Sequence, residues 1–369
     1  MQPSNFRTLG RSGLVVSQFA LGTMTFGAGR WGSDDEASRA VFDGYVAAGG
    51  NFIDTADVYS GGRSEEMIGG FVKETGWRDR LVLATKAGFP CETGHPMAGG
   101  NGAKHIHKAL DGSLRRLKTD YIDLFWLHVW DQVTPASEVL QTMASLIKSG
   151  KIRYYGLSNI PAWYAAQMAT LAAAHGLPGP IAVQVQYSLV DREIEREHIG
   201  VAKEFGMGVL GWSPLGGGLL TGKYDRETVG NQAPSGFELP STGMAGPTES
   251  NGRLAGANPF GDTKFTDHNW AVLEAVRGVA QEAGYTPAQV ALAWALGQLG
   301  ITGLIIGASR AEQLDANMAA SQIALSADQM AQLSAISAPQ DHFFSPWLQN
   351  LVFGGQSVQG WGQRATSGQ

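Results

Sequence analysis

Residues 121–128 read Tyr-Ile-Asp-Leu-Phe-Trp-Leu-His, a short and mostly apolar run that ends in a histidine. On either side of it, residues 106–117 and residues 139–146 carry apolar side chains at the three- and four-residue spacing of a buried helix face. A short apolar run between two such helices is typical of a parallel sheet whose strands are joined by helical crossovers. This stretch therefore predicts an α/β fold.

The same unit recurs along most of the chain. Apolar runs alternate with helix-like segments and lie at residues 19–21, 52–53, 81–84, 122–127, 154–157, 181–185, 209–212 and 301–306. About eight strand–helix units is the number that closes a (β/α)8 barrel, the TIM barrel fold. Ahead of the first unit, residues 6–16 predict a small β-hairpin that turns at Gly10-Arg11-Ser12-Gly13.

We expect one barrel domain over residues 1–369, with two additions. Residues 225–266 are rich in Gly, Pro, Ser and Asn and lack periodicity, which predicts a long loop after the seventh strand. In a barrel this loop lies at the end where active sites are found. Residues 340–369 form a C-terminal extension rich in aromatic side chains, which predicts a segment that docks on the body of the protein.

The composition narrows the classes of function and partner. The net charge is −6 and no cluster of Lys and Arg is present, so no nucleic-acid partner is expected. No apolar run approaches the roughly 20 residues that span a membrane, so no membrane partner is expected. A cytoplasmic location is expected instead. Cys91 is the single cysteine, which excludes an intramolecular disulfide. No metal is expected, and the oligomeric state stays unknown.

Two glycine-rich stretches suggest competing hypotheses. Residues 27–32 match the G-x-G-x-x-G pattern of a Rossmann-type dehydrogenase, with Asp54 at the expected distance. However, Ser33 is the better N-cap, so all three glycines precede the helix instead of lying inside it. Residues 217–223 match most of a phosphate-binding Walker A loop, but Tyr224 stands where Ser or Thr should hold magnesium. Such a loop could still approach the phosphate of a different cofactor.

Four polar residues of different types stand at or just after the ends of successive predicted strands. Asp54, Lys86 and His128 each close an apolar run, and Tyr59 follows Asp54 in the next loop. Singly, each has an ordinary structural explanation as an ion-pair partner, a core residue or a solvated side chain. The carboxyl ends of barrel strands converge at one end, so we expect all four around one cavity.

Their chemistry suits the reduction of a carbonyl group, whose oxygen gains negative charge and needs a proton. A phenol has an ordinary pKa near 10, and an adjacent Lys86 ammonium would lower the pKa of Tyr59 by stabilising the phenolate. Asp54 would pair with Lys86 and hold it charged in a partly dry site. His128 would donate a hydrogen bond to the substrate oxygen and orient it.

At these residues the chain resembles the aldo-keto reductase family. The likeness runs in family order over roughly residues 6 to 320, through residues 51–59, 81–86, 120–128, 156–159, 184–188, 212–215 and 307–314. The resemblance implies a (β/α)8 barrel that reduces aldehydes and ketones. It implies that Tyr59 is the general acid, that Lys86 and Asp54 tune it, and that His128 orients the substrate.

The resemblance also implies a bound NADPH or NADP+. Residues implied at the nicotinamide and its ribose are Gly22, Thr23, Met24, Asp54, Ser158, Asn159, Gln184 and Trp212. Residues implied at the pyrophosphate are Ser213, Pro214, Leu215, Gly217 and Lys223. Residues implied at the adenine end are Gly307, Ser309, Arg310, Gln313 and Asn317. Arg310 favours NADPH over NADH, because a guanidinium suits the 2′-phosphate.

The substrate is expected to be a small carbonyl compound of unspecified kind. Trp31, Phe89 and Trp130 lie near predicted strand ends and are candidates to line an apolar substrate pocket. A regulatory subunit of the potassium-channel β type, which has the same family barrel and binds NADP(H), is the alternative from a different functional class. The Rossmann-type dehydrogenase is the third hypothesis.

Overall fold

The computed structural model describes residues 6–28, 32–92, 94–229, 254, 264–339, 352 and 356 of the 369-residue chain. Two compact units divide the chain, Met1–Ser337 and Ala338–Gln369. Most of the expected loop at 225–266 and most of the expected extension at 340–369 lie outside the described residues, and so does Trp31. The expectation of a single domain over residues 1–369 stays a prediction.

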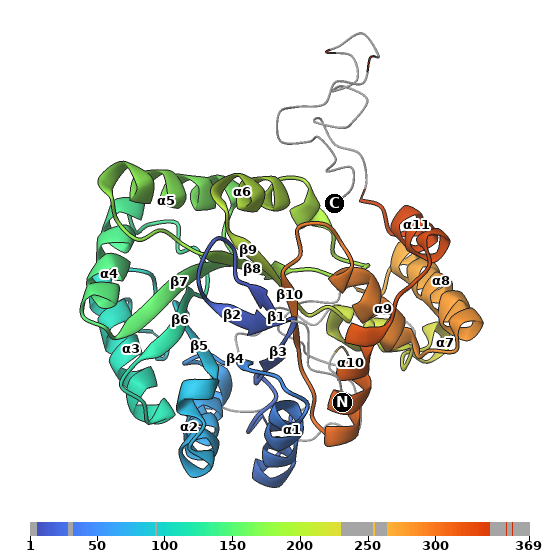
Figure 1. The fold of residues 1–369 in the computed structure, drawn as a ribbon, viewed down its shortest axis with the longest axis horizontal. Helices are drawn as coiled ribbons and strands as arrows, with labels where there is room; N and C mark the ends of the chain where they lie inside the picture. Colours follow the sequence, from blue (N-terminus) through green and yellow to red (C-terminus); the bar gives the residue numbers. More distant parts are fainter. Residues whose placement is uncertain are drawn as a thin grey trace. The chain divides into compact units, whose positions relative to one another are not determined.

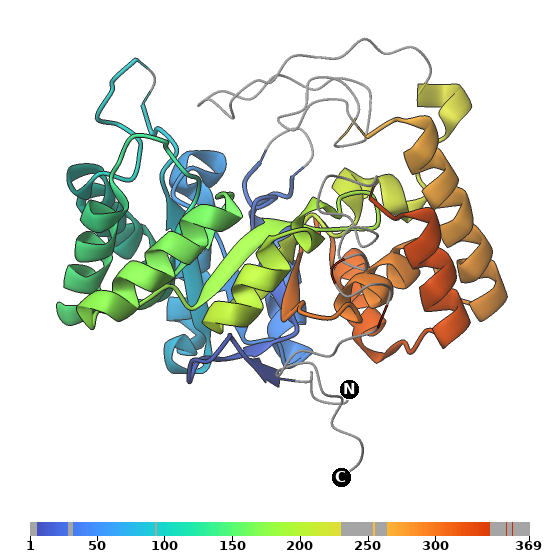
Figure 2. The same cartoon turned by 90° about the horizontal axis from the view of Figure 1, so that it is seen from above.

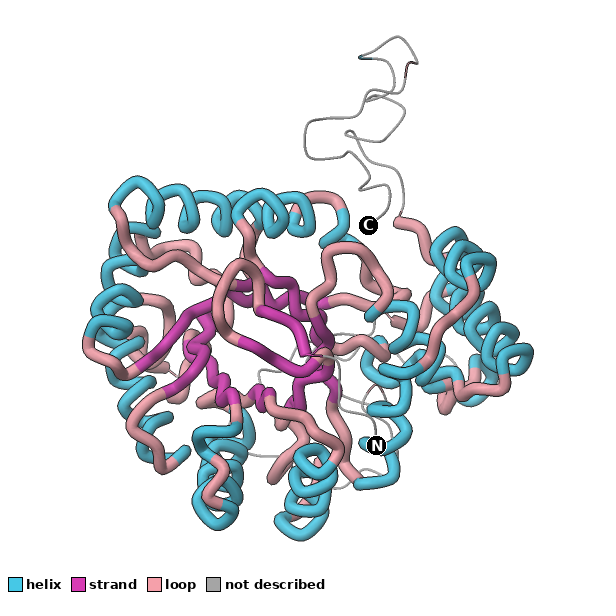
Figure 3. The backbone as a smooth tube through the Cα atoms, viewed as in Figure 1, coloured by secondary structure: helices cyan, strands magenta, loops and turns pink. Residues whose placement is uncertain are grey.

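Eight parallel strands close into a barrel in the first unit, in the order β10-β3-β4-β5-β6-β7-β8-β9. Figure 3 shows them as a ring inside the helices. The strands are β3 (Phe19–Gly22), β4 (Phe52–Asp54), β5 (Val82–Ala87), β6 (Ile122–Leu127), β7 (Ile152–Ser158), β8 (Ala182–Gln186), β9 (Gly208–Trp212) and β10 (Gly303–Ile306). Each coincides with one of the predicted apolar runs, so the predicted TIM barrel is confirmed. A closed barrel contradicts the Rossmann hypothesis, which requires an open sheet.

Helices join successive strands and cover the outside of the barrel (Figure 1). They are α1 (Asp35–Ala47), α2 (Arg63–Thr75), α3 (Ala103–Leu117), α4 (Ala136–Lys148), α5 (Ala162–His175), α6 (His198–Phe205), α7 (Arg226–Val229), α8 (Asp267–Ala283), α9 (Pro287–Leu296), α10 (Ala311–Ala319) and α11 (Ala327–Ile336). Within the described residues, none of the helices combines the length and apolar character that a membrane span requires.

The start of α1 differs from the sequence prediction. The N-cap is Asp34, whose side chain accepts a hydrogen bond from the Ala37 N–H. Ser33, the predicted cap, instead exchanges a 2.7 Å hydrogen bond with the buried Ser38 hydroxyl. Both residue types are good caps, and burial of the Ser33–Ser38 contact decides between them.

A hairpin closes the amino-terminal end of the barrel. β1 (Phe6–Thr8) and β2 (Val15–Ser17) pair antiparallel, as the sequence predicts. The turn packs so tightly that a Cβ on Gly10 would lie 2.5 Å from the Gly206 carbonyl oxygen, and Gly10 has a φ of +61° that favours glycine. Figure 2 shows the hairpin at one end of the barrel and the longer loops after the strands at the other. The carboxyl ends of the strands are therefore the open end.

The barrel interior is filled by side chains. It comprises Leu9, Val16, Ala20, Phe52, Val82, Ala84, Leu124, Trp126, Ala182, Leu210 and Ile305. The Trp126 ring lies so close to β7 that a Cβ on Gly156 would be 2.3 Å from its Cζ3 atom. Glycine at this position therefore makes room for a large ring beneath the open end of the barrel.

Candidate active site

The ends of β4 and β5 and the loop after β4 bring Asp54, Lys86 and Tyr59 together. The Lys86 ammonium donates to a carboxylate oxygen of Asp54 and to the Thr55 carbonyl at 2.8 Å. It also donates to the Tyr59 hydroxyl oxygen at 3.3 Å. An ammonium has three N–H donors, so these three contacts use all of them. They hold the positive charge of Lys86 beside the phenol oxygen of Tyr59.

Lys86 and Asp54 form a buried ion pair, with exposed fractions of 0% and 2%. Burial alone would lower the pKa of Lys86, but the Asp54 charge raises it above its ordinary value. Burial raises the pKa of Asp54, while Lys86 and the Gln184 amide, which donates at 3.0 Å, act in the opposite direction. Each charge is tolerated in the interior because the other is present.

His128 completes the group from the end of β6. Its ring meets the Tyr59 ring edge-on at a centroid distance of 5.8 Å and the Phe89 ring at 4.6 Å. Burial and then the nearby Lys86 charge hold the pKa of His128 well below its ordinary value. Both effects favour the neutral imidazole, a form in which one ring nitrogen is a donor and the other an acceptor.

The loop that carries Tyr59 is tied to its neighbours through the backbone. The Asp57 N–H donates to the Lys86 carbonyl at 3.1 Å, and the Ser60 hydroxyl donates to the Phe26 carbonyl at 2.9 Å. Ser60 has a φ of 50°, an uncommon conformation for a non-glycine residue. This backbone path leaves Tyr59 in contact with both Lys86 and His128.

The loops after β5 and β6 are fastened to each other by Asn101, a residue that sequence analysis did not identify. Asn101 is 1% exposed and donates through its side chain to the Val129 carbonyl at 2.8 Å. Its backbone N–H donates to the Asp131 carboxylate at 2.7 Å. These bonds hold Phe89 and His128 in contact, and no local sequence pattern could have shown them because 28 to 30 residues separate the partners.

Four residues implied at the nicotinamide lie beside the catalytic group. Ser158 and Gln184 are buried at the ends of β7 and β8, and Gln184 is bonded to Asp54. Asn159, with a φ of 50°, accepts a hydrogen bond from the half-buried Trp212 indole at 3.0 Å. Uncommon backbone conformations of this kind cluster at functional sites.

The glycine-rich segment after β9 combines left-handed glycine conformations with a nearby ammonium. Gly217 and Gly218 have φ values of 68° and 98°, and the Gly217 N–H is held by the Ser213 hydroxyl at 3.0 Å. A Cβ on Gly218 would lie 3.1 Å from the Lys223 Nζ atom, so an ammonium lies against this backbone. Leu254, from the predicted long loop, packs on Gly217. Pro214 and Leu215 form the connection from β9.

The ends of β3 and β10 carry the other implied cofactor residues. Gly22 is the last residue of β3 and Thr23 and Met24 follow it, and the Thr23 N–H donates to the Asp54 carbonyl at 3.0 Å. In the segment after β10, the Ser309 hydroxyl and N–H each donate to the Gln313 side-chain oxygen at 3.1 Å. The remaining residues there are the exposed Gly307, the buried Asn317 and the exposed Arg310.

These residues fit a phosphate-bearing dinucleotide. The Lys223 ammonium beside the glycine-rich segment and the exposed Arg310 guanidinium provide positive charge and N–H donors for phosphate groups. The buried amide and hydroxyl of Gln184 and Ser158 suit a carboxamide, and the Trp212 ring suits a flat ring system.

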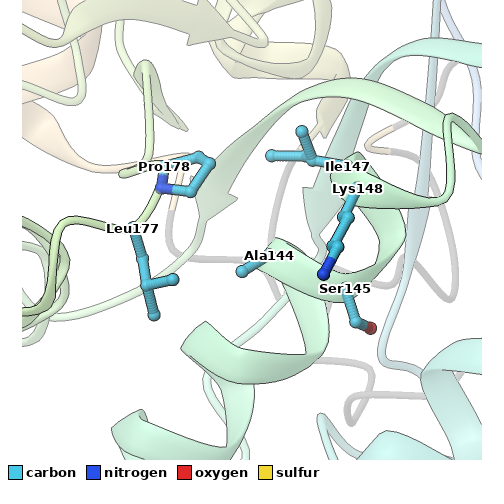
Figure 4. Close-up of a pocket in the computed structure, with 6 residues that line it drawn as sticks. All are labelled: Ala144, Ser145, Ile147, Lys148, Leu177 and Pro178. Atoms are coloured by element: carbon cyan, nitrogen blue, oxygen red, sulfur yellow. The ribbon is translucent and has the colours of Figure 1, made fainter.

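Among the cavities formed by the described residues, two of about 300 Å³ each lie outside the cluster of predicted catalytic residues. One adjoins it at the ends of β7 and β8 and is lined by Asn159, Gln186 and residues 190–194, among others. The other is lined by Ala144, Ser145, Ile147, Lys148, Leu177 and Pro178 (Figure 4). Its residues belong to the last turns of α4 and to the segment after α5, at the amino-terminal end of the barrel. It holds none of the predicted catalytic residues.

Of the predicted pocket residues, Phe89 and Trp130 are half-buried at the open end of the barrel, and Trp31 lies outside the described residues. The structure thus brings the predicted catalytic residues into one group and sets the predicted nicotinamide residues next to it. Their roles stay predictions.

The chain matches one family model and is similar to several known proteins over most of its length. A family model described as the aldo/keto reductase family matches residues 18–338. A Bacillus subtilis protein named as an uncharacterized oxidoreductase is 32% identical over 338 residues, which are 89% of this chain and 94% of the relative. A norsolorinic acid reductase of Emericella nidulans is 33% identical over 329 residues, 86% of this chain and 78% of the relative. A Schizosaccharomyces pombe protein named as a candidate voltage-gated potassium channel subunit beta is 35% identical over 326 residues, 86% of this chain and 89% of the relative.

Proposed function

The chain belongs to the aldo/keto reductase family, and we propose that it is an NADPH-dependent oxidoreductase that reduces aldehydes or ketones to alcohols. The observation that carries the proposal is the contact of the buried Lys86 ammonium with both Asp54 and the Tyr59 hydroxyl oxygen. A phenol with an ammonium against its oxygen is suited to give up a proton, because the charge that remains is stabilised at once.

Each side chain then has a defined task. Lys86 donates to the Tyr59 oxygen, so the Tyr59 O–H points away from Lys86, and it would donate to the carbonyl oxygen of a bound substrate. Asp54 keeps the ammonium charged in the dry interior. Neutral His128 donates an N–H to the same substrate oxygen and stabilises the charge that develops there.

NADPH, when bound, supplies the hydride that reduces the carbonyl carbon. Ser158, Asn159 and Gln184 would hold its carboxamide, and Trp212 would stack on the nicotinamide ring. Gly22, Thr23 and Met24 would adjoin the ribose. The pyrophosphate would be held by Ser213, Pro214, Leu215, Gly217 and Lys223, and the adenine end by Gly307, Ser309, Arg310, Gln313 and Asn317.

The test is a comparison of Tyr59→Phe with the parent protein. The phenyl ring keeps the edge contact with His128 but removes the proton, so we expect the turnover of an aldehyde panel with NADPH to fall about 10²- to 10⁴-fold. NADPH binding, measured by calorimetry, should change little. Tyr285→Phe is the matched control, because Tyr285 is 42% exposed on the connection between α8 and α9. Turnover that survives Tyr59→Phe would remove Tyr59 from the role of acid.

A regulatory role of the potassium-channel β type is the second candidate, favoured by the 35% identity to the Schizosaccharomyces pombe relative. It predicts that the protein binds NADPH and co-purifies with a membrane protein, while no carbonyl in the panel is turned over. Turnover that depends on Tyr59 would favour the enzyme.

The substrate pocket is proposed to include Phe89 and Trp130, whose rings lie at the open end of the barrel, and Trp31. These aromatic side chains suit carbonyl compounds with apolar or bulky substituents, and one relative is named a norsolorinic acid reductase. A panel of aldehydes, ketones, sugars and quinones, followed through NADPH oxidation, would identify the class.

A further inference from the structure

Three aromatic side chains gather beside the catalytic group, on the loops after β6 and β7. Trp130 follows β6, and Trp163 and Tyr164 lie in the first turn of α5 after β7. We call Trp130, Trp163 and Tyr164 the aromatic corner. Of the three, only Trp130 is among the residues predicted from the sequence to line the substrate pocket.

The Trp163 ring stands at right angles to the two other rings of the corner, and the Trp130 and Tyr164 rings are tilted by 41° to each other with centroids 6.0 Å apart. The Trp130 and Trp163 ring centroids are 5.2 Å apart with an interplanar angle of 88°, and Trp163 and Tyr164 are 5.8 Å apart at 85°. Tyr164 is 3% exposed and Trp130 is half-buried, so these two rings form a fixed base. Trp163 is 55% exposed. A flat aromatic ligand that binds to two perpendicular indoles can stack on the face of one and contact the edge of the other.

The corner is continuous with the proposed active site. Trp130 is two residues after His128, which limits the separation of their Cα atoms to about 7 Å. The Trp130 N–H donates to the Asn159 carbonyl at 3.4 Å, and the Asn159 side chain donates to the His128 carbonyl at 2.9 Å. A compound whose carbonyl reaches His128 and Tyr59 can therefore extend its remaining atoms toward the corner.

The charge around the corner favours a neutral ligand. The nearby carboxylate is Asp131, which already accepts hydrogen bonds from the Asn101 N–H at 2.7 Å and from the Thr134 hydroxyl and N–H. No Lys or Arg within the described residues stacks on the corner's rings. The surface is thus aromatic, with a hydrogen-bonded carboxylate nearby and no stacked cation among the described residues, so it does not suit a phosphate or other anion.

We propose that the aromatic corner binds the aromatic part of the substrate and that Trp163 determines a preference for flat aromatic carbonyl compounds over short aliphatic ones. The proposal rests on the proposed function for the identity of the reacting group. The stacking surface itself does not depend on turnover. Trp163 contributes little to the buried core, so its replacement should remove this surface and leave the fold intact.

The first experiment compares naphthaldehyde with butanal as substrates of the parent protein, Trp163→Ala and Trp163→Phe. We expect Trp163→Ala to raise KM for naphthaldehyde about five- to tenfold with kcat unchanged, because one aromatic contact is lost. Its kcat/KM for butanal should change by less than twofold, and Trp163→Phe should keep most of the preference. Leu299→Ala is the control, since Leu299 is 93% exposed just before β10.

A second measurement separates this proposal from the proposed function. The Kd of naphthalenemethanol, measured by calorimetry with NADPH present, reports binding to the corner without any reaction. We expect Trp163→Ala to raise this Kd five- to tenfold, whether or not any carbonyl is turned over. An unchanged Kd, or an equal loss of kcat/KM for butanal and naphthaldehyde, would overturn the assignment of the corner.

Discussion

Replacement of Asp54 by Asn leaves the shape of the site almost unchanged and removes the one anion that neutralises Lys86. Lys86 is 0% exposed and Asp54 is 2% exposed, so neither water nor a mobile counter-ion can take the place of the carboxylate. Loss of one partner of a buried pair costs about 3–5 kcal/mol of the free energy of unfolding. Urea unfolding at pH 7 should show a loss of this size.

The loss should shrink as the pH rises. In Asp54→Asn, burial is no longer opposed by the Asp54 charge, so the pKa of Lys86 falls below the roughly 10.4 of the unfolded chain. Between these two pKa values the unfolded state binds more protons, so the stability of the variant rises with pH, by up to about 1.4 kcal/mol per pH unit. In the parent protein the pKa of Lys86 is raised, so this group keeps its proton and adds no such slope.

The chain offers a matched surface pair as the control. Lys151 and Asp111 have the same residue types at 2.7 Å, but their side chains are 41% and 48% exposed. Asp111→Asn should therefore cost at most about 1 kcal/mol, with no dependence on pH between 7 and 9. The double variant Asp54→Asn/Lys86→Met should recover much of the stability, because no unpaired charge is left. A loss for Asp54→Asn that matches the surface control, or that grows with pH, would refute the reasoning.

Three further predictions address other parts of the fold and site. Gly156→Ala places a Cβ 2.3 Å from the Trp126 ring and should lower the free energy of unfolding by about 1–3 kcal/mol. Gly278→Ala, on a helix position with open space, should instead stabilise by about 0.5–1 kcal/mol, and equal effects would contradict the packing argument. His128 has a folded pKa well below its ordinary value, so its contribution to stability is present above pH 6.5 and is lost as the pH falls. Between pH 7.5 and 5.5 the free energy of unfolding of His128→Asn, measured in urea, should therefore fall by about 1.4 kcal/mol less than that of the parent protein. Plots of this free energy against pH that run parallel for the two proteins would argue against a buried neutral imidazole. Arg310→Ala should raise the Kd of NADPH tenfold or more and leave the Kd of NADH unchanged in calorimetry, whereas equal changes would reject contact with the 2′-phosphate.

The fold could be predicted from the sequence because its signals are local. Each barrel strand is a short apolar run, and each helix shows its own periodicity, so the order of elements follows without knowledge of distant contacts. The start of α1 was predicted one residue early, because Ser33 and Asp34 are both good caps and only the buried Ser33–Ser38 contact distinguishes them. The Rossmann hypothesis was wrong because a glycine pattern does not report whether a sheet is open or closed.

The candidate site could be predicted in part. Asp54, Lys86 and His128 each end an apolar run, and parallel strands place their carboxyl ends together, so a shared location follows from order alone. The hydrogen bond from Gln184 to Asp54 joins residues 130 positions apart on strands that are not neighbours in the sheet. No sequence spacing encodes that contact, because it depends on the curvature that brings opposite walls of the barrel within reach.

The sequence by itself therefore determined the order of strands and helices and the polar residues at their ends, since both depend on patterns within a few residues. Only the tertiary structure decided which side chains meet: Gln184 on Asp54, Asn101 between two loops, and the right-angled rings of Trp130 and Trp163. The Gln184–Asp54 contact follows from closure of the barrel by β10 against β3, which sets the distance between opposite walls. The Asn101 and Trp130–Trp163 contacts follow from the pairing of β5 with β6 and of β6 with β7, which places the loops after these strands side by side. Periodicity predicts which face of an element is buried, but only the closed fold sets what lies opposite it.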